Sequence, residues 1–284
     1  MTRWSILILA LVACSGGQPA QHGPETPHPE PEAPEAPKPD AMPDTPVLDA
    51  AALAKSAENT ALVPSPVETE RALVAAGVET QLASLIPKHT FDLEKSDVDH
   101  AAVRTGVVLG DMLLTVKTAE KDKLIERLES VRKGLGQLEG GSDIDKTLND
   151  YVASIQADAI SRDELLKEFD ELSGAIIPEL EFNGKERVVP LIQAGSWLEG
   201  ANLVAQAVKA KGTPAAADGL LKQPAVVAYF SKYVKTEAEA PQQVTKTLEA
   251  SLATLQGLAE KKEPLTAEDI DTVIKTTSDV LGLL

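Results

Sequence analysis

The sequence predicts an all-α protein, a multi-helix bundle or helical-hairpin array of about eight or nine helices preceded by a disordered segment. Three observations predict this class. From about Val47 onward, apolar residues recur at three- and four-residue spacing, as in helices that bury one face. Helix start signals repeat along the chain, such as Ser65-Pro66-Val67-Glu68, where a cap residue precedes a first-turn proline and a capping-box acid. No stretch alternates convincingly with period two, the pattern of a half-buried strand.

The expected helices follow from these signals in chain order. The first begins at Ser65 and should run to Pro87, because proline removes a backbone donor. The fifth begins at Ser161 and should break near Pro178 and Asn183-Gly184, and the sixth has Pro190 in its first turn. The expected ranges are about 65–86, 96–117, 119–138, 142–158, 161–183 with a break near 178, 186–209, 224–234, 241–260 and 266–283. The short connections favour antiparallel neighbours.

The second expected helix carries glycines on its predicted buried face. At about 100° per residue, one face of this helix holds six residues: Val103, Gly106, Val107, Gly110, Leu113 and Leu114. Glycine costs up to about 1 kcal/mol in a helix interior, so two glycines on the buried face predict a close crossing by another helix. Gly195 and Gly200 in the sixth helix echo this pattern, and a duplication of helical halves is one interpretation.

Two charged residues border the same face. Arg104 and Asp111 are too far apart in sequence to pair with each other, so each is expected to bond a charge on a neighbouring helix. Glu199 is one candidate for such a neighbour. A boundary ion pair is the favoured interpretation, and a carboxylate-dependent hydrolase using Asp111 and Glu199 is the alternative.

The sixth helix and the helix after it carry the aromatic candidates. Trp197 could form the floor of a ligand pocket with Glu199 and Asn202 as a polar rim, or could simply fill the core. A cluster of rings in the following helix is a candidate partner surface, with core packing as the alternative: Tyr229, Phe230 and Tyr233.

The composition excludes several classes of function. The chain has 44 acidic and 27 basic side chains and a formal net charge of -17, so its surface repels phosphate backbones and we expect no nucleic-acid partner. Aromatic residues make up 3%, which argues against a surface for stacking sugars or nucleotides. Cys14 is the only cysteine, so no internal disulfide or thiolate metal cluster can form.

Chemistry-bearing motifs are missing from the sequence. It contains no phosphate-binding Gly-x-x-x-x-Gly-Lys-Ser/Thr loop and no Gly-x-Ser-x-Gly nucleophile elbow. Asp97, Asp99 and His100 cluster at a helix start with His89 upstream, but helix capping explains these acids without a metal. We therefore predict no enzyme activity, no cofactor and no metal site.

The N-terminal part of the sequence differs from the rest. Residues 14–47 are rich in proline, glutamate and alanine, and six acids there face the single base Lys38. Such a composition can bury almost nothing, so this segment is expected to be an extended, disordered tether. A folded all-α domain is expected over residues 48–284.

Residues 1–13 have the features of an export signal. Arg3 precedes an uncharged apolar run that is much shorter than the roughly 20 residues of a membrane-spanning helix. The following residues, Leu11-Val12-Ala13-Cys14, resemble the lipobox of bacterial lipoproteins. This resemblance implies cleavage before Cys14 and attachment of lipid to that cysteine. Because Ser15 follows the cysteine, it also implies the outer membrane facing the periplasm if the source is Gram-negative.

These observations together predict a lipid-anchored protein of the cell envelope. The leading hypothesis is a non-enzymatic interaction or scaffolding module that binds another envelope protein and is held at the membrane through Cys14. The alternative is a periplasmic ligand-binding or transport-accessory lipoprotein with a pocket around Trp197. The carboxylate hydrolase is the third hypothesis.

Overall fold

The structure is a computed structural model that describes residues 63–79, 81–87, 91, 93, 97–236 and 242–283. Within these residues every regular element is helical, which confirms the all-α prediction. They belong to one compact unit, Asp49–Leu284. The predicted signal and tether, including Cys14, lie outside the described residues.

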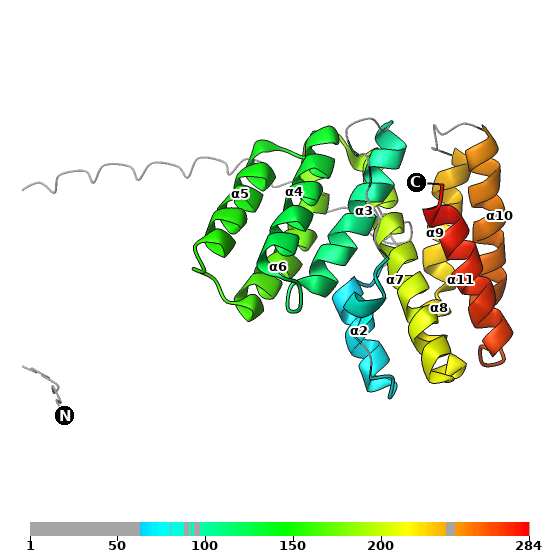
Figure 1. Cartoon of the computed structure of the whole chain (residues 1–284). Coiled ribbons are helices and arrows are strands. Elements are labelled where there is room, and N and C mark those ends of the chain that lie inside the picture. Colours follow the sequence, from blue (N-terminus) through cyan, green and yellow to red (C-terminus); the bar gives the residue numbers. More distant parts are fainter. Residues whose placement is uncertain are drawn as a thin grey trace, which may run out of the picture. The chain divides into compact units, whose positions relative to one another are not determined.

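The described residues form ten α-helices and three 3₁₀ turns (Figure 1). The helices are α2 (Pro66–Ala75), α3 (Val98–Thr115), α4 (Lys121–Gln137), α5 (Ser142–Gln156), α6 (Arg162–Phe182), α7 (Val189–Lys211), α8 (Asp218–Leu221), α9 (Pro224–Thr236), α10 (Gln242–Ala259) and α11 (Ala267–Leu281). The 3₁₀ turns are η1 (Leu82–Leu85), η2 (Glu186–Val188) and η3 (Pro214–Ala217). Nine of the α-helices match the nine expected ranges, and the four-residue α8 is additional.

Predicted N-terminal caps form at the first and the last of the described helices, and also at α6. At α2, the Glu68 backbone N–H donates to Ser65 Oγ while the Ser65 N–H donates to the Glu68 carboxylate. The same reciprocal capping box starts α6 at Ser161 and α11 at Thr266. These boxes satisfy backbone donors that a helix leaves unpaired in its first turn, so they define where these helices begin.

One predicted boundary and one predicted break are wrong. The first helix ends at Ala75 instead of near Ile86, because Gly77 takes a left-handed conformation with φ of 85° and turns the chain. The fifth helix does not break at Pro178 but continues to Phe182, and so ends at the other predicted break, Asn183-Gly184. A proline ring crowds the carbonyl group four residues earlier, and here that residue is Gly174, whose peptide can tilt most easily.

The core of the unit is built around α3 and α7. Helix α3 packs mainly on α7 and α4, and α7 packs on α11 and α2. In Figure 1, α4 to α6 lie on one side of this pair and α9 to α11 on the other. Most residues of α3 are buried, so this helix is enclosed on several sides and not on one face alone.

Glycines set the distance between α3 and α7. A Cβ atom on Gly106 would overlap the backbone carbonyl oxygen of Ile192, and a Cβ on Gly195 would overlap that of Val103. The backbones of the two helices are therefore in direct contact at both glycines. This confirms the predicted close crossing at Gly106, whereas at Gly110, the other glycine of that prediction, an added Cβ would make only ordinary contacts with Pro66 and Ser196.

Candidate binding groove

An apolar groove lies beside α10 and is bounded by five of the described helices. One wall is a stripe on α10, namely Val244, Leu248, Leu252 and Leu255. The opposite wall comes from α7, with Leu191, Ala194 and Leu198. Helix α9 contributes Phe230 and Tyr233, and the first turn of α3 contributes Asp99 and His100. The end of α11 contributes Val280, and Leu283 lies just beyond this helix. We call this site the α10 groove.

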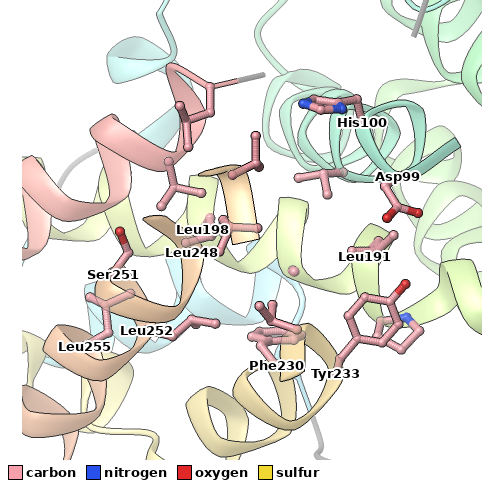
Figure 2. A pocket seen from close by; sticks show the side chains of 17 residues that line it. Asp99, His100, Leu191, Leu198, Phe230, Tyr233, Leu248, Ser251, Leu252 and Leu255 are labelled. Carbon is pink, nitrogen blue, oxygen red and sulfur yellow. The ribbon is translucent and has the colours of Figure 1, made fainter. Parts of the chain in front are cut away.

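The α10 stripe follows from the sequence of this helix. Its apolar residues recur every three or four positions, so they share one face. Part of that face packs on α9 and α11, but Leu248 remains half-buried and points into the groove (Figure 2). From Val244 to Leu255 the stripe extends for about 16 Å along the helix axis. The groove is therefore long in the direction of α10.

The enclosed part of the groove is small. Its cavity volume is about 80 Å³, whereas an apolar cavity of about 150 Å³ accommodates one benzene molecule. The groove also opens to the surface at Leu283, whose side chain is 39% exposed. A bound group would therefore enter from outside and would be only partly enclosed.

Charged side chains occur at one end of the groove only. Figure 2 shows Asp99 and His100 on α3 at one end, and Leu252 and Leu255 on α10 at the other. Arg187 donates to the Asp99 carboxylate at 2.6 Å, and His100 Nδ1 lies 2.7 Å from a carboxylate oxygen of Asp97. Each of the two acidic side chains at this end is thus paired with a basic side chain, while the rest of the groove is almost wholly apolar.

Asp97 also caps α3. Its carboxylate accepts a hydrogen bond from the His100 backbone N–H at 3.0 Å. Partial burial by itself would raise the pKa of Asp97, but hydrogen bonds from the His100 backbone and ring, with the charge on His100, lower this pKa below its ordinary value of 3.8. Asp97, Asp99 and His100 therefore serve as a cap and as ion-pair partners. Among the described residues, no group of three or more His, Cys, Asp or Glu side chains is arranged to hold a metal ion.

Two of the three rings that the sequence suggested as a partner surface, Phe230 and Tyr233, line this groove instead of an open face. Phe230 and Tyr233 are only 3% and 5% exposed. The Phe230 ring lies between Trp197 and Tyr229, at centroid distances of 5.7 and 5.4 Å. Tyr229 is half-buried, and its hydroxyl donates to Gln193 on α7 at 3.3 Å.

The structure separates the three residues proposed for a pocket at Trp197. Trp197 is buried, and its indole N–H donates to Gln223 at 3.3 Å. The two spaces beside this ring measure about 10 Å³ each, which is the room for at most one water molecule. Asn202 instead donates to the hydroxyl groups of Thr277 and Ser278, and so ties α7 to α11. The larger cavity lies against the Phe230 ring, which packs on Trp197.

The predicted charged residues near the glycine crossing are placed apart from the groove. Arg104 is half-buried and its guanidinium lies 6.0 Å from the centre of the Phe91 ring, a cation–π contact. Asp111 and Glu199 are 4% and 1% exposed. A hydrolytic carboxylate pair needs space for a substrate and a water molecule between its members, and such deep burial does not provide that access.

The sequence did not single out the walls of the α10 groove. The spacing of apolar residues on α10 and α7 indicated that these faces are buried, but not that they leave space between them. Phe230 and Tyr233 were the only groove residues singled out for binding. The acids at the α3 end had been explained by helix capping, with a metal site that includes His100 as the alternative.

Comparisons of the chain with known protein families, curated proteins and solved structures found no match. None of the described helices is long and apolar enough to cross a bilayer. The function is therefore argued from the groove and from the N-terminal sequence.

Proposed function

We propose that this protein is a lipid-anchored, non-enzymatic binding module of the cell envelope, with the α10 groove as its binding site. The observation that carries the proposal is an open apolar groove formed by five helices. Apolar concave sites with a few polar groups at one end are typical of ligand pockets. This proposal keeps the ligand-binding hypothesis but moves the site from Trp197 to the groove that Phe230 lines.

The anchor is proposed from the resemblance of residues 11–14 to a lipobox. In this proposal Cys14 carries the lipid, and the proline-rich tether separates the helical domain from the membrane. Several acyl chains on one cysteine bind a bilayer more firmly than the marginal hold of a single chain. The proposed location is the outer membrane facing the periplasm, if the source is Gram-negative.

The lipid anchor is tested by the substitution Cys14→Ser, which replaces the sulfur atom that would carry the lipid. The Cys14→Ser chain should move from the membrane fraction to the soluble fraction, because it has lost the only acceptor for lipid. Mass analysis of the wild-type N-terminus should show a mature chain that begins at an acylated Cys14. An unmodified cysteine, or a retained leader in the cytosol, would contradict the anchor.

Scaffolding of another envelope protein is the second candidate, and one surface feature favours it. The side chain of Phe182, at the end of α6, is 86% exposed, and exposed aromatic residues are enriched at protein interfaces. Crosslinking in intact cells, followed by purification of the lipidated protein, separates the two candidates. A stoichiometric small molecule supports the groove, whereas a reproducible protein partner that is lost with Phe182→Ala supports scaffolding.

A further inference from the structure

We infer that the α10 groove binds one acyl chain of an envelope lipid, with the chain lying lengthwise along α10 and the polar head group outside. The inference rests on the proposed function, since it names the ligand class of the same site. Three properties of the groove lead to it: the chemistry of its walls, its size and length, and the distribution of charge at its ends.

The walls are suited to a hydrocarbon. Along α10 and α7 the groove presents Leu191, Leu198, Leu248, Leu252 and Leu255, and side chains of this kind cannot hydrogen-bond a ligand. A polar molecule inserted there would lose its hydrogen bonds to water without replacement, which costs several kcal/mol per polar group. An aliphatic chain gives up no hydrogen bonds and gains from each methylene that it buries.

The enclosed volume and the length of the groove limit the kind of apolar group. A helix of a partner protein is about 10–12 Å across with its side chains, and a cavity volume of about 80 Å³ does not enclose such a helix. An extended hydrocarbon chain can lie along the open groove with part of its length in this cavity, and the α10 stripe of about 16 Å provides contacts along it.

The distribution of charged side chains indicates at which end of the groove the head group lies. The charged side chains gather at the α3 end, where Asp97 and Asp99 are paired with His100 and Arg187. This end carries no excess positive charge, and the chain as a whole has a formal net charge of -17. An uncharged or zwitterionic head group therefore fits better than an anionic one. The apolar end of the ligand lies toward Leu252 and Leu255.

The first test uses the purified full chain carrying Cys14→Ser, which has no lipid of its own and needs no detergent. Calorimetric titration with monoacylglycerols of increasing chain length should show one site per chain. Binding should tighten by up to about fourfold with each added methylene until the α10 stripe is covered, and then level off. Dodecanoate should bind more weakly than the glycerol ester of the same chain length, because its head group is anionic.

Matched variants locate the binding site. Ala194→Phe, on the α7 wall, fills the groove and should weaken binding of monododecanoylglycerol at least tenfold. Ala253→Phe makes the same substitution at an exposed position of α10 outside the groove and should change affinity less than twofold. Ser251→Leu fills the groove from the α10 side, and it provides a second blocked variant if Ala194→Phe fails to fold. Circular dichroism and melting temperatures identify the folded variants.

The outcomes distinguish this inference from the proposed function. Absence of saturable binding, or equal binding by the folded blocked variants and Ala253→Phe, would overturn the acyl-chain site even if Cys14 is lipidated. Groove-dependent binding by a protein whose Cys14 is never acylated would uphold the site and refute the anchor. Native mass spectrometry of wild type and Cys14→Ser then identifies the source: a lipid recovered with both is diffusible, and one recovered with wild type only belongs to the protein's own anchor.

Discussion

Gly195 shows how a single hydrogen atom in place of a side chain determines a helix contact. Together with Gly106 it allows the backbones of α3 and α7 to touch, and any side chain at either position would overlap a carbonyl group of the other helix. At Gly200, a second glycine in the same helix, a methyl group would meet no atom of a neighbouring described segment within 4 Å. The two glycines of α7 therefore have different roles.

At the scale of single residues, we predict that replacing Gly195 or Gly200 by alanine has opposite effects on the free energy of unfolding. Gly195→Ala should lower the free energy of unfolding by about 1–3 kcal/mol, because the added methyl group forces the helices apart. Gly200→Ala should raise it by up to about 1 kcal/mol, since alanine favours the helix and nothing opposes it. Urea denaturation of the two variants and wild type measures both changes. Equal effects would show that the close crossing does not limit packing.

At the scale of elements, α11 is held to α7 by a polar contact within an apolar interface. The Asn202 amide donates to Thr277 Oγ1 at 2.7 Å and to Ser278 Oγ at 2.9 Å, and its carbonyl oxygen accepts a hydrogen bond from Gln206. Because Asn202 is only 3% exposed, water does not replace these bonds readily. This contact orients α11, whose end forms part of the groove.

We predict that Asn202→Ala loosens α11 more than the rest of the unit. The substitution removes the shared donor and should cost about 1–3 kcal/mol of stability. Hydrogen exchange should accelerate first at the amides of α11, while the amides of α4, which packs on α3 and α5, should change least. Uniform acceleration over all helices would contradict a local role for this contact.

At the scale of the whole molecule, carboxyl groups with lowered pKa values make the stability of the fold depend on pH. Hydrogen bonds or ion pairs lower the pKa of several carboxyl groups spread over the unit: Asp97, Glu126, Glu139, Glu164 and Asp269. The effect is large at Asp269, where burial would raise the pKa, but Lys261 and the Thr266 cap outweigh it and lower the pKa from 3.8 to about 2. A lowered pKa in the folded state means that the unfolded chain binds the proton first.

The stability that these groups contribute is therefore present above about pH 4 and lost as the pH falls toward 2. We predict that Asp269→Asn, which keeps a cap acceptor but has no charge to titrate, makes the melting temperature depend less steeply on pH in this window. Thermal unfolding between pH 2 and pH 6 tests the difference. An unchanged slope in the variant would show that Asp269 is not coupled to folding.

Much of this molecule was predictable from short-range patterns. The positions of nine helices, the capping boxes at Ser65 and Ser161, and the glycine-mediated crossing of α3 were expected from residues within a few positions of each other. The end of α2 and the continuity of α6 were not, because the backbone angles at Gly77 and Pro178 depend on what the neighbouring segments allow. Local sequence patterns identify positions where a helix can end, and tertiary packing decides whether it ends there.

The sequence by itself determined the all-α class, the helix starts, and the acidic, cysteine-poor character of the chain, because caps, periodicity and charge are properties of near neighbours. Only the tertiary structure decided that α10 stands off from α7 and leaves a groove between them. An apolar face indicates that a helix is buried, but whether the opposing side chains meet depends on residues as far apart in sequence as Asp99 and Leu255. The candidate site is the space between α10 and α7, so the sequence of no single helix predicts it.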